Sequence, residues 1–537
     1  MTVHAAVASA LTDLGTETIF GVLGDANMLY LTDFMRDKHG RFVGATHEGA
    51  AVSMADGYSR VSGRTGVASV THGPALTNTL TALVEAVRNR SRLLLITGET
   101  PPVHGYMQDI DIRGVVSPTG AGYERVYRVS DAVPAVCRAF RRIAAERRPI
   151  VLDVPFDLLA RPVPQDTSVR AVLTETVCAP DAAALDRALG LLAAARRPVI
   201  VAGRGAVQAG AREPIIAVAR ATGAYLATTL LAKDYFRGVE GNLGICGSLS
   251  TRVASREIAA ADCVLAIGAG LNSFTAAALP QKAKVIHCDN DPGAFGVRTP
   301  VDVAVLADAR AAAVAMAVAL DEAGVHRART SLAQLEADIA ADPPGADFAD
   351  ASDDHTVDVR SAMIRLDEML PSERMVVTDI GRYMIAPWRY LHVDRPAHFV
   401  HSCNFGSIGL GLGTAIGASV ADGDVPVVAV LGDGGFMMNM AEFSTAVRNK
   451  LGLMVIVAND GAYGAEYRKL AEYGVDPAYA LNDWPDFTAV AEAMGARGVA
   501  VRSVKELDAV AELVPALADG PVLVDLKLNP SVEIGLP

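Results

Sequence analysis

The sequence predicts an α/β protein built from three doubly wound parallel-sheet domains. Short continuous apolar runs recur along the chain, each ends abruptly in polar or glycine residues, and helical patterns lie between them. Such runs are typical of parallel strands that are buried on both faces. The length of 537 residues is too great for a single core and favours three or four domains.

The first domain is expected over residues 1–165. It opens with a helix over residues 3–14, whose apolar side chains share one face and which Gly15 should end. Polar turns follow its strands and should gather along one edge of the sheet. The expected strands are 18–22, 42–45, 67–70, 93–96 and, last along the chain, 151–154.

The central domain is expected over residues 180–335, after a linker at about 161–180 that contains proline and threonine. Its first strand, 199–202, runs into Gly203-Arg204-Gly205. A glycine-rich turn in this place could bind phosphate, but more often it lets the following helix pack closely, and we favour close packing here. Further strands are expected near 225 and at 263–267 and 284–288.

The third domain is expected over residues 356–537, after a second linker at 340–356 that is rich in Asp, Ala and Pro. A strand at 427–431 breaks into Gly432-Asp433-Gly434-Gly435, and helical spacing follows over 436–450. The next strand, 453–458, stops at Asn459-Asp460-Gly461. This strand–turn–helix–strand pattern is typical of a parallel βαβ unit, whose strand ends open on one crevice where ligands usually bind.

Two polar side chains at these strand ends predict a metal site. Asp433 and Asn459 should lie side by side, and both offer the oxygen ligands that Mg²⁺ or Ca²⁺ prefers. With a backbone carbonyl near Gly461, coordination positions remain that a diphosphate could fill. The glycines at 434 and 435 would let backbone N–H groups approach its oxygens. The alternative is an ordinary Gly-Asp-Gly turn, which we consider the weaker interpretation.

Glu48 is the leading candidate functional residue of the first domain. It follows a predicted strand and precedes small residues, so its side chain should project from a helix start into a crowded apolar place. A carboxylate is costly to bury there unless it is protonated or paired. It could equally be a carboxylate that the helix dipole favours, and the residues alone leave both interpretations open.

Together these motifs resemble the thiamine diphosphate-dependent enzymes of the pyruvate decarboxylase and acetolactate synthase superfamily. Gly-Asp-Gly followed some two dozen residues later by Asn is similar to their cofactor-anchoring segment. Four further stretches carry the likeness: His47–Ala51 with Met54–Arg60, Thr71–Asn78, Asp379–Gly381 and Asn404–Gly409. Ala75 stands where the second of these usually has a glycine.

The resemblance implies a pyrimidine-binding first domain and a diphosphate-binding third domain. It implies that Asp433, Asn459 and the Gly461 carbonyl hold Mg²⁺, and that Glu48 hydrogen-bonds the aminopyrimidine and favours the tautomer that removes the thiazolium proton. Ile408 would wedge between the cofactor rings. The other implied cofactor-binding residues are Asn78, Gly381, Gly406, Gly434, Gly435 and Tyr463.

The residues that would contact a substrate give mixed indications. Asp25 lies in a turn that is similar to that of decarboxylases which release aldehydes, yet His104 is the only histidine in a loop where those enzymes tend to have two. Met107-Gln108-Asp109 instead looks like a carboligase pattern, in which a glutamine reaches the reacting carbonyl. The candidates to line the pocket are Asp25, His47, His72, His104, Gln108 and Glu466, although each histidine could equally be structural.

These indications favour a lyase or carboligase that acts on a 2-oxo acid or related ketone. A 2-oxo acid decarboxylase that releases an aldehyde is the alternative. A flavin-dependent oxidase and a non-catalytic nucleotide-binding protein are less favoured. Flavin binding is doubtful because Gly268–Ser273 departs from the arginine-rich stretch of flavin-requiring relatives.

Composition and charge limit the classes of partner and the cellular compartment that we expect. The net charge of −13 disfavours nucleic acid, and no apolar run approaches the ~20 residues of a membrane span. The six cysteines show no spacing for zinc or a disulfide framework, and the N-terminus does not look like a secretory signal, so a cytoplasmic location is expected. The resemblance implies a homodimer or homotetramer with active sites at the subunit interface.

Overall fold

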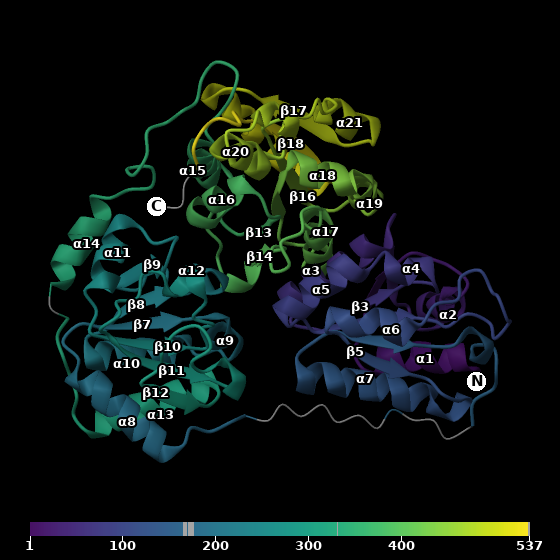
Figure 1. Ribbon diagram of the computed structural model, residues 1–537, viewed down its shortest axis with the longest axis horizontal. Helices are drawn as coiled ribbons and strands as arrows, with labels where there is room; N and C mark the ends of the chain where they lie inside the picture. The colour runs from purple at the N-terminus through teal and green to yellow at the C-terminus, as the bar shows by residue number, and fades with distance from the viewer. Residues whose placement is uncertain (165–168, 170–176, 330, 535–537) are drawn as a thin grey trace.

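Three six-stranded sheets, all with parallel strand pairs, form the framework of the molecule. The computed structural model describes residues 1–164, 169, 177–329 and 331–534. The first and central domains lie side by side, and the third domain rests above them (Figure 1). Helices flank each sheet, so the predicted fold class is confirmed. Across the described residues, every helix is too short or too polar to cross a membrane.

The first sheet has the strand order β2-β1-β3-β4-β6-β5. The predicted stop of the first helix is confirmed, because α1 ends at Asp13 and Gly15, two residues later, has φ +86°. The strand β5 was not expected from the sequence. The strands are β1 (Thr18–Gly21), β2 (Arg41–Gly44), β3 (Gly66–Ser69), β4 (Leu93–Thr97), β5 (Gly122–Arg125) and β6 (Ile150–Asp153), and the helices are α1 (Val3–Asp13), α2 (Met28–Asp37), α3 (Glu48–Ser62), α4 (Pro74–Thr77), α5 (Leu80–Asn89), α6 (Ile112–Val116) and α7 (Ala132–Glu146).

The central sheet has a different strand order, β12-β11-β10-β7-β8-β9. The strands are β7 (Pro198–Ala202), β8 (Tyr225–Thr228), β9 (Asn242–Ile245), β10 (Cys263–Ile267), β11 (Lys284–Asp289) and β12 (Val303–Leu306). The helices are α8 (Ala182–Ala194), α9 (Arg204–Gln208), α10 (Arg212–Thr222), α11 (Arg252–Ala259), α12 (Ser273–Ala276), α13 (Ala309–Glu322) and α14 (Leu332–Ala340).

The glycine-rich turn after β7 serves close packing, as favoured from the sequence. A Cβ atom on Gly203 would lie 2.3 Å from the carbonyl oxygen of Gly268, and the N–H of Gly205 donates to that same oxygen at 2.9 Å. The backbone donors that a phosphate would need at this turn therefore already bond within the domain.

The third sheet has the order β14-β13-β15-β16-β18-β17. The strands are β13 (Met375–Thr378), β14 (Phe399–His401), β15 (Val427–Gly432), β16 (Leu453–Asn459), β17 (Arg497–Val501) and β18 (Val522–Lys527). The helices are α15 (Val359–Met369), α16 (Ile385–Tyr390), α17 (Gly411–Ala421), α18 (Asp433–Asn439), the 3-10 turn η8 (Met440–Glu442), α19 (Phe443–Arg448), α20 (Gly464–Glu472), α21 (Phe487–Ala493) and α22 (Asp508–Leu513).

The prediction of one helix over residues 436–450 is wrong. The segment consists of α18, η8 and α19, and the break lies at Asn439. Asn439 has φ −130°, and its side-chain N–H donates to the carbonyl of Gly409 in a neighbouring loop. This tertiary bond draws the residue out of the helical conformation that its sequence spacing favoured.

Helices α3 and α17 cross closely and join the first domain to the third (Figure 1). A Cβ on Gly57 would lie 2.1 Å from the carbonyl oxygen of Thr414, and one on Gly417 would lie 1.8 Å from that of Met54. Glycine is thus required on both helices for the backbones to approach. Because α3 begins at Glu48, this crossing carries the predicted proton-transfer residue to the edge of the third domain.

Candidate active site

The predicted metal ligands of the third domain lie side by side. Strands β15 and β16 pair in register, with Gly432 opposite Ala458, so that Asp433 and Asn459 follow at adjacent strand ends. The N–H of Gly461 reaches both side chains, donating to Asp433 Oδ2 at 2.8 Å and to Asn459 Oδ1 at 3.2 Å. The oxygens needed for a cation therefore converge on one small region.

Neighbouring groups orient these ligands. The amide nitrogen of Asn459 donates to Asp525 Oδ1 at 2.8 Å, while its amide oxygen accepts the N–H of Gly461. The carbonyl of Gly461 accepts the N–H of Asn482 at 2.7 Å and keeps a second lone pair for a cation. The indole N–H of Trp484 donates to Asp433 Oδ2 at 3.0 Å. Such outer contacts fix the geometry of a metal site.

The electrostatics of Asp433 fit a divalent cation. Its side chain is 3% exposed, and burial, with a smaller contribution from Asp460, raises its pKa to about 7. Among the described residues, the oxygens of Asp433 accept hydrogen bonds from N–H groups but form no ion pair with Lys or Arg. Asp460, in contrast, pairs with Arg382 at 2.8 Å. A buried carboxylate in this state gains a counter-charge when a hard cation binds, so the residues fit Mg²⁺.

Three loops of the third domain meet beside the predicted metal pocket, which Asp433, Asn459 and Gly461 form. A Cβ on Gly434 would lie 2.6 Å from the ring of Tyr463. One on Gly435 would lie 2.9 Å from Asp379 Oδ2 and 3.7 Å from the Cβ of Ile408. The predicted cofactor-binding segments 379–381, 404–409 and 434–435 thus converge, and only glycine leaves room at the turn.

The loop at 404–409 is tied down at its end. Asp379 is 1% exposed and accepts the N–H of Ile380 at 2.9 Å and the hydroxyl of Ser402 at 3.1 Å. It also accepts the N–H of Gly409 at 2.6 Å. Burial raises its pKa to about 6. Ile408 itself is half-buried, so part of its side chain is free to contact a ligand.

In the first domain, α3 begins at Glu48 as predicted. His47 Nδ1 accepts the N–H of Gly49 at 3.0 Å and caps the helix. The carboxylate of Glu48 accepts a hydrogen bond from the side chain of Asn78 at 3.0 Å, which brings two predicted cofactor-binding residues together. The expectation of a crowded apolar place is not met within the single chain, where Glu48 is only half-buried.

His72 and Gln108, two of the predicted pocket residues, are in contact. Gln108 Oε1 lies 3.0 Å from Nε2 of His72, which is 1% exposed. The imidazole meets the rings of Tyr106 and Phe156 edge-on. Gly73 has φ +62°, and a Cβ there would strike the backbone of Gln108 at 2.4 Å. The loop after β4 is therefore held against the end of β3.

The remaining predicted substrate residues are exposed. Asp25 lies in the turn after β1, which is joined to the end of β3 because the N–H of Ala26 donates to Thr71 Oγ1 at 3.1 Å. His104 lies in the exposed loop after β4, and Glu466 is on α20 of the third domain. Within the part of the chain that the structure describes, no side-chain hydrogen bond joins these three residues to the contacts described above.

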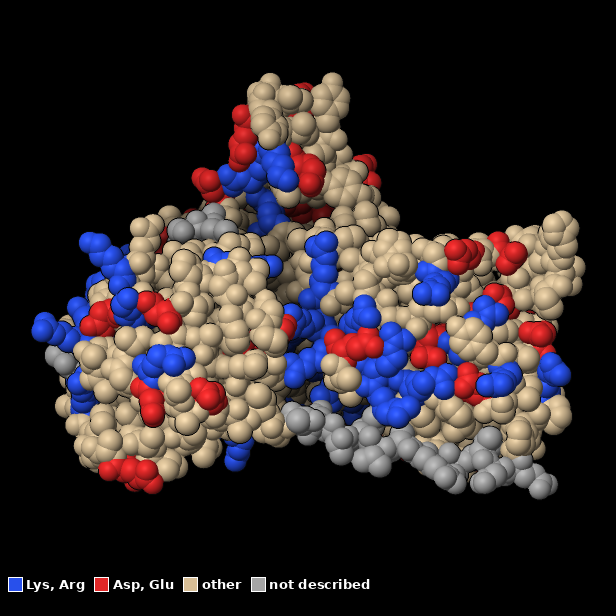
Figure 2. Space-filling view, turned by 60° about the horizontal axis from the view of Figure 1, so that its bottom comes forward, with Lys and Arg blue, Asp and Glu red and all other residues tan. Residues whose placement is uncertain are grey.

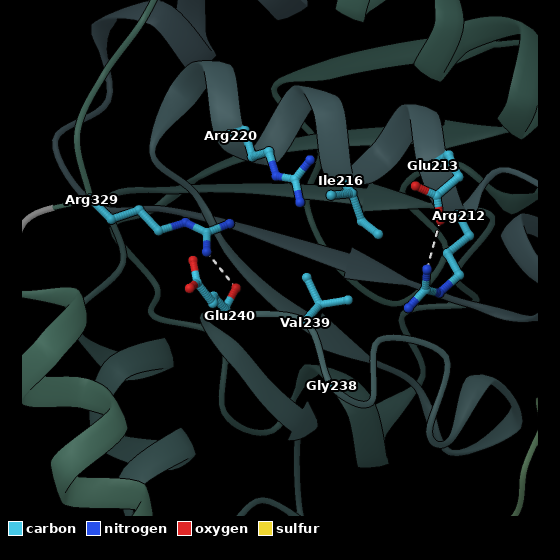
Figure 3. A pocket seen from close by; sticks show the side chains of 8 residues that line it. All are labelled: Arg212, Glu213, Ile216, Arg220, Gly238, Val239, Glu240 and Arg329. Carbon is cyan, nitrogen blue, oxygen red and sulfur yellow. Dashed lines mark hydrogen bonds and ion pairs between the residues drawn. The ribbon is translucent and has the colours of Figure 1, made fainter.

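A cavity of about 460 Å³ in the central domain does not contain these residues. Figure 3 shows its lining, in which Arg220 and Arg329 face the cavity and Arg212 pairs with Glu213 at 2.6 Å. The residues that line it come from α10 and from the segments near 238–240 and 329. It is therefore separate from the polar strand ends of the first and third domains.

Sequence models of known protein families match all three domains. Residues 1–112 match the N-terminal TPP binding domain of thiamine pyrophosphate enzymes, residues 185–316 match the central domain, and residues 379–526 match the C-terminal TPP binding domain. The two TPP binding domains contain Glu48 and Asp433, respectively. The chain belongs to the thiamine pyrophosphate enzyme family. The resemblance seen in the sequence is thus confirmed.

Relatives of this thiamine pyrophosphate enzyme span nearly its whole length. It is 27% identical to a probable acetolactate synthase large subunit of Methanocaldococcus jannaschii, over 98% of this chain and 92% of that protein. It is 31% identical to a probable 2-ketoarginine decarboxylase of Pseudomonas aeruginosa, over 95% and 90%. A thiamine diphosphate-dependent 4-hydroxybenzoylformate decarboxylase of Rhodococcus jostii has the same fold, with a TM-score of 0.83 and 22% identity over 98% of this chain and 99% of that one.

Proposed function

We propose that this enzyme uses thiamine diphosphate and Mg²⁺ to cleave the bond between the carbonyl and carboxylate carbons of a 2-oxo acid. The carbonyl carbon, which keeps the electron pair of the broken bond, would then form a new bond to the carbonyl carbon of a second compound. The observation that carries the proposal is the pairing of buried Asp433 with Asn459 around the N–H of Gly461, in a domain that belongs to the family's C-terminal cofactor-binding module. Both oxygens suit a cation that binds a diphosphate.

In this proposal the chain supplies binding, orientation and a proton carrier. Thiamine diphosphate supplies an electron sink for the pair that remains when carbon dioxide leaves. Asp433, Asn459 and the carbonyl of Gly461 would hold the cation. Glu48, oriented by Asn78, would hold and release a proton at its carboxyl oxygen. The close contacts around Gly434 and Gly435 would keep water out of the diphosphate end.

The contact between His72 and Gln108 favours carboligation. It holds the glutamine at the strand ends where substrate would approach, and a fixed amide can orient a carbonyl for attack. Simple decarboxylation, in which the same carbon takes a proton and leaves as an aldehyde, is the second candidate. It is favoured by the 31% identity to a protein named as a probable 2-ketoarginine decarboxylase.

Surface charge supports a small-molecule substrate and argues against nucleic acid. Figure 2 shows basic side chains on the face that includes the lower edge of the first domain, with acidic side chains among them. On α7, which lies along this edge in Figure 1, Arg138 pairs with Asp131 at 2.9 Å and Arg142 pairs with Glu146 at 2.6 Å. Within each pair the two charges neutralise one another, and the chain as a whole carries a net charge of −13.

Assembly into a homodimer or homotetramer is part of the proposal. Apolar side chains are exposed next to both halves of the site, including Met107 in the loop after β4 at 94%, Met438 on α18 at 58% and Tyr473 at the end of α20 at 82%. A second copy of the chain would cover such surfaces and could bring its own Glu48 to the metal pocket. Light scattering with and without cofactor tests this, and a monomer in the presence of thiamine diphosphate and Mg²⁺ would contradict it.

The decisive experiment is a substrate screen with product identification. The chain, loaded with thiamine diphosphate and Mg²⁺, is incubated with 2-oxo acids and 1,2-diketones, with and without aldehyde acceptors, and products are identified by mass spectrometry. We expect 2-hydroxy ketones that contain the acceptor, and aldehydes alone would select the second candidate. Peroxide with a yellow protein would indicate an oxidase. Asp433→Ala is the control for cofactor dependence, and no turnover of any substrate by the loaded chain would overturn the proposal.

A further inference from the structure

Glu442 of the third domain is buried against the first domain. Its side chain is 0% exposed, and one carboxylate oxygen accepts the N–H of Thr46 at 2.8 Å, the N–H of His47 at 2.8 Å and the hydroxyl of Thr46 at 2.6 Å. The second oxygen accepts the hydroxyl of Thr445 at 2.8 Å. Four donors thus satisfy a carboxylate that would otherwise be costly to bury.

The two residues that Glu442 holds form the connection directly before Glu48. Strand β2 ends at Gly44 and α3 begins at Glu48, so Thr46 and His47 determine where the helix starts. Their N–H groups donate across a sequence separation of 396 and 395 residues to the third domain. The start of α3, and with it the backbone position of Glu48, therefore depends on the carboxylate of Glu442.

A reciprocal contact runs from the first domain to the third. Glu85 on α5 is 2% exposed and accepts the side-chain N–H of Asn404 at 2.7 Å and the backbone N–H of Phe405 at 2.6 Å. These residues precede Gly406 and Ile408, the predicted pyrimidine-binding positions. Each domain therefore holds a cofactor loop of the other with one buried glutamate.

These glutamates are not needed merely to hold the two domains together. The crossing of α3 and α17 already provides a continuous apolar contact, with Gly57, Gly413 and Gly417 each opposite backbone or side-chain atoms of the partner helix. Buried carboxylates are a costly means of adhesion compared with apolar packing. They do, however, fix the position of backbone N–H groups, because four hydrogen bonds converge on one rigid group.

We infer that Glu442 is a positioning residue that sets the geometry of proton transfer by Glu48. The inference rests on the proposed function of Glu48. Removal of the carboxylate would free the Thr46–His47 backbone, so that Glu48 no longer meets the cofactor at a fixed distance, while the metal pocket and its affinity remain. Glu85 would hold the loop at 404–409 by the same kind of contact. Its loss should weaken cofactor binding, because that loop contains predicted cofactor-binding residues.

Three variants, Glu442→Gln, Glu442→Asp and Glu442→Ala, distinguish a positioning role of Glu442 from a merely structural one. Glu442→Gln keeps an oxygen for the Thr46 and His47 donors and an N–H that can donate to Thr445. Glu442→Asp keeps the charge but withdraws the carboxylate by one carbon, and it remains informative if Glu442→Ala does not fold. The matched control is Lys233→Met, which removes another buried charged contact between domains, from Lys233 to the carbonyl of Trp388 at 2.8 Å, far from Thr46 in sequence.

The first measurement needs no cofactor. Hydrogen–deuterium exchange of the peptide that contains Thr46 and His47 should accelerate about tenfold or more in Glu442→Ala and Glu442→Asp, and by less than about threefold in Glu442→Gln and Lys233→Met. The second measurement is the exchange of the thiazolium C2 proton of bound cofactor, followed by NMR. It should slow about 10- to 100-fold in the Ala and Asp variants. The calorimetric Kd for thiamine diphosphate should change by less than about threefold.

A merely structural role predicts a different pattern. Thermal stability would fall in Glu442→Ala as in Lys233→Met, and the C2 exchange rate per bound cofactor would stay at the wild-type value in the Ala and Asp variants. That result would overturn the inference. Glu48→Gln separates its failure from that of the proposed function: if Glu48→Gln slows C2 exchange but Glu442→Asp does not, only the positioning inference fails, and if Glu48→Gln has no effect, the role of Glu48 fails as well.

Discussion

The first and third domains differ from the central domain in both strand order and the use of their strand ends. Counted from each domain's own N-terminus, the first and third sheets share the order 2-1-3-4-6-5, whereas the central sheet has the order 3-2-1-4-5-6. The latter is typical of dinucleotide-binding domains. Yet the turn after β7 is closed, because Gly203 and Gly205 donate to the carbonyls of Ile267 and Gly268.

Strand order therefore provides a crevice, but the residues at the strand ends decide whether that crevice can bind a ligand. In the central domain, close backbone contacts at Gly203 and Gly268 fill the crevice. In the third domain, the equivalent edge presents Asp433 and Asn459, and in the first it presents Glu48 and His72. If function is confined to the outer two domains, substitutions at their strand ends should impair it and matched substitutions in the central domain should not.

The largest effect is expected at Glu48. Glu48→Gln keeps the size and hydrogen bonding of the side chain but removes its ability to carry a proton, so kcat should fall about 10³-fold, within the usual range for an acid–base residue. Cofactor affinity should change little. The matched control is Glu240→Gln in the arginine-lined cavity of the central domain, which should leave kcat within about twofold of wild type. Steady-state kinetics measure kcat for both variants. An equal loss of kcat in the two would contradict the view that only the outer domains take part in catalysis.

A smaller effect is expected for cofactor affinity at Asp433. Asp433→Asn removes the charged ligand, and the Kd for thiamine diphosphate in the presence of Mg²⁺ should rise about 100-fold, since even supporting contacts at metal sites contribute 10- to 100-fold. Asp289→Asn is the counterpart at a strand end of the central domain, and it should leave the Kd unchanged. Titration calorimetry decides the comparison, and unaltered affinity of Asp433→Asn would count against the metal site.

A further prediction concerns the pH dependence of Asp433, whose pKa burial raises from 3.8 to about 7. A cation needs the ionised carboxylate, so Mg²⁺-dependent cofactor affinity should fall as pH decreases below about 7, approaching tenfold per pH unit. The cofactor-free chain should respond in the opposite sense. Its folded state holds the proton more tightly than the unfolded state, so the free energy of unfolding should fall as pH rises from about 4 to about 7.

Calorimetry and denaturant unfolding across this range measure the two trends. Asp433→Asn should flatten both of them. Persistence of the stability trend in that variant would assign it to other groups, such as Asp379, whose pKa burial raises to about 6.

The sequence predicted the parts of the site that depend on local pattern. A buried strand that ends in Gly432-Asp433 and another that ends in Asn459 are recognisable because hydrophobicity changes abruptly at the strand end. Parallel pairing then places the two ends together, as the register of Gly432 with Ala458 does. Glu48 was found in the same way, as a helix start after β2.

The contacts that support the site could not be found in this way. Glu442 and Glu85 hold loops more than 300 residues away in sequence, and Trp484 reaches Asp433 from 51 residues downstream. Neither glutamate differs in local pattern from an ordinary helical surface residue. The break at Asn439 likewise depends on a bond to Gly409, so helical spacing alone predicted a continuous helix there.

The smallest effect, of opposite sign in two helices, is expected for glycine-to-alanine changes. In α17, Gly417→Ala would place a Cβ 1.8 Å from the carbonyl of Met54, so the crossing with α3 must open, at a cost of about 1–3 kcal/mol. In α8 of the central domain, Gly190 meets no atom within 4 Å, and Gly190→Ala should stabilise its helix by about 0.5–1 kcal/mol. Thermal unfolding of the cofactor-free chain should therefore shift down in the first variant and up in the second. If Gly417→Ala did not change the stability, the contact between the two outer domains would not depend on this close backbone crossing. Other contacts would then have to fix the position of α3, which begins at Glu48, relative to the third domain.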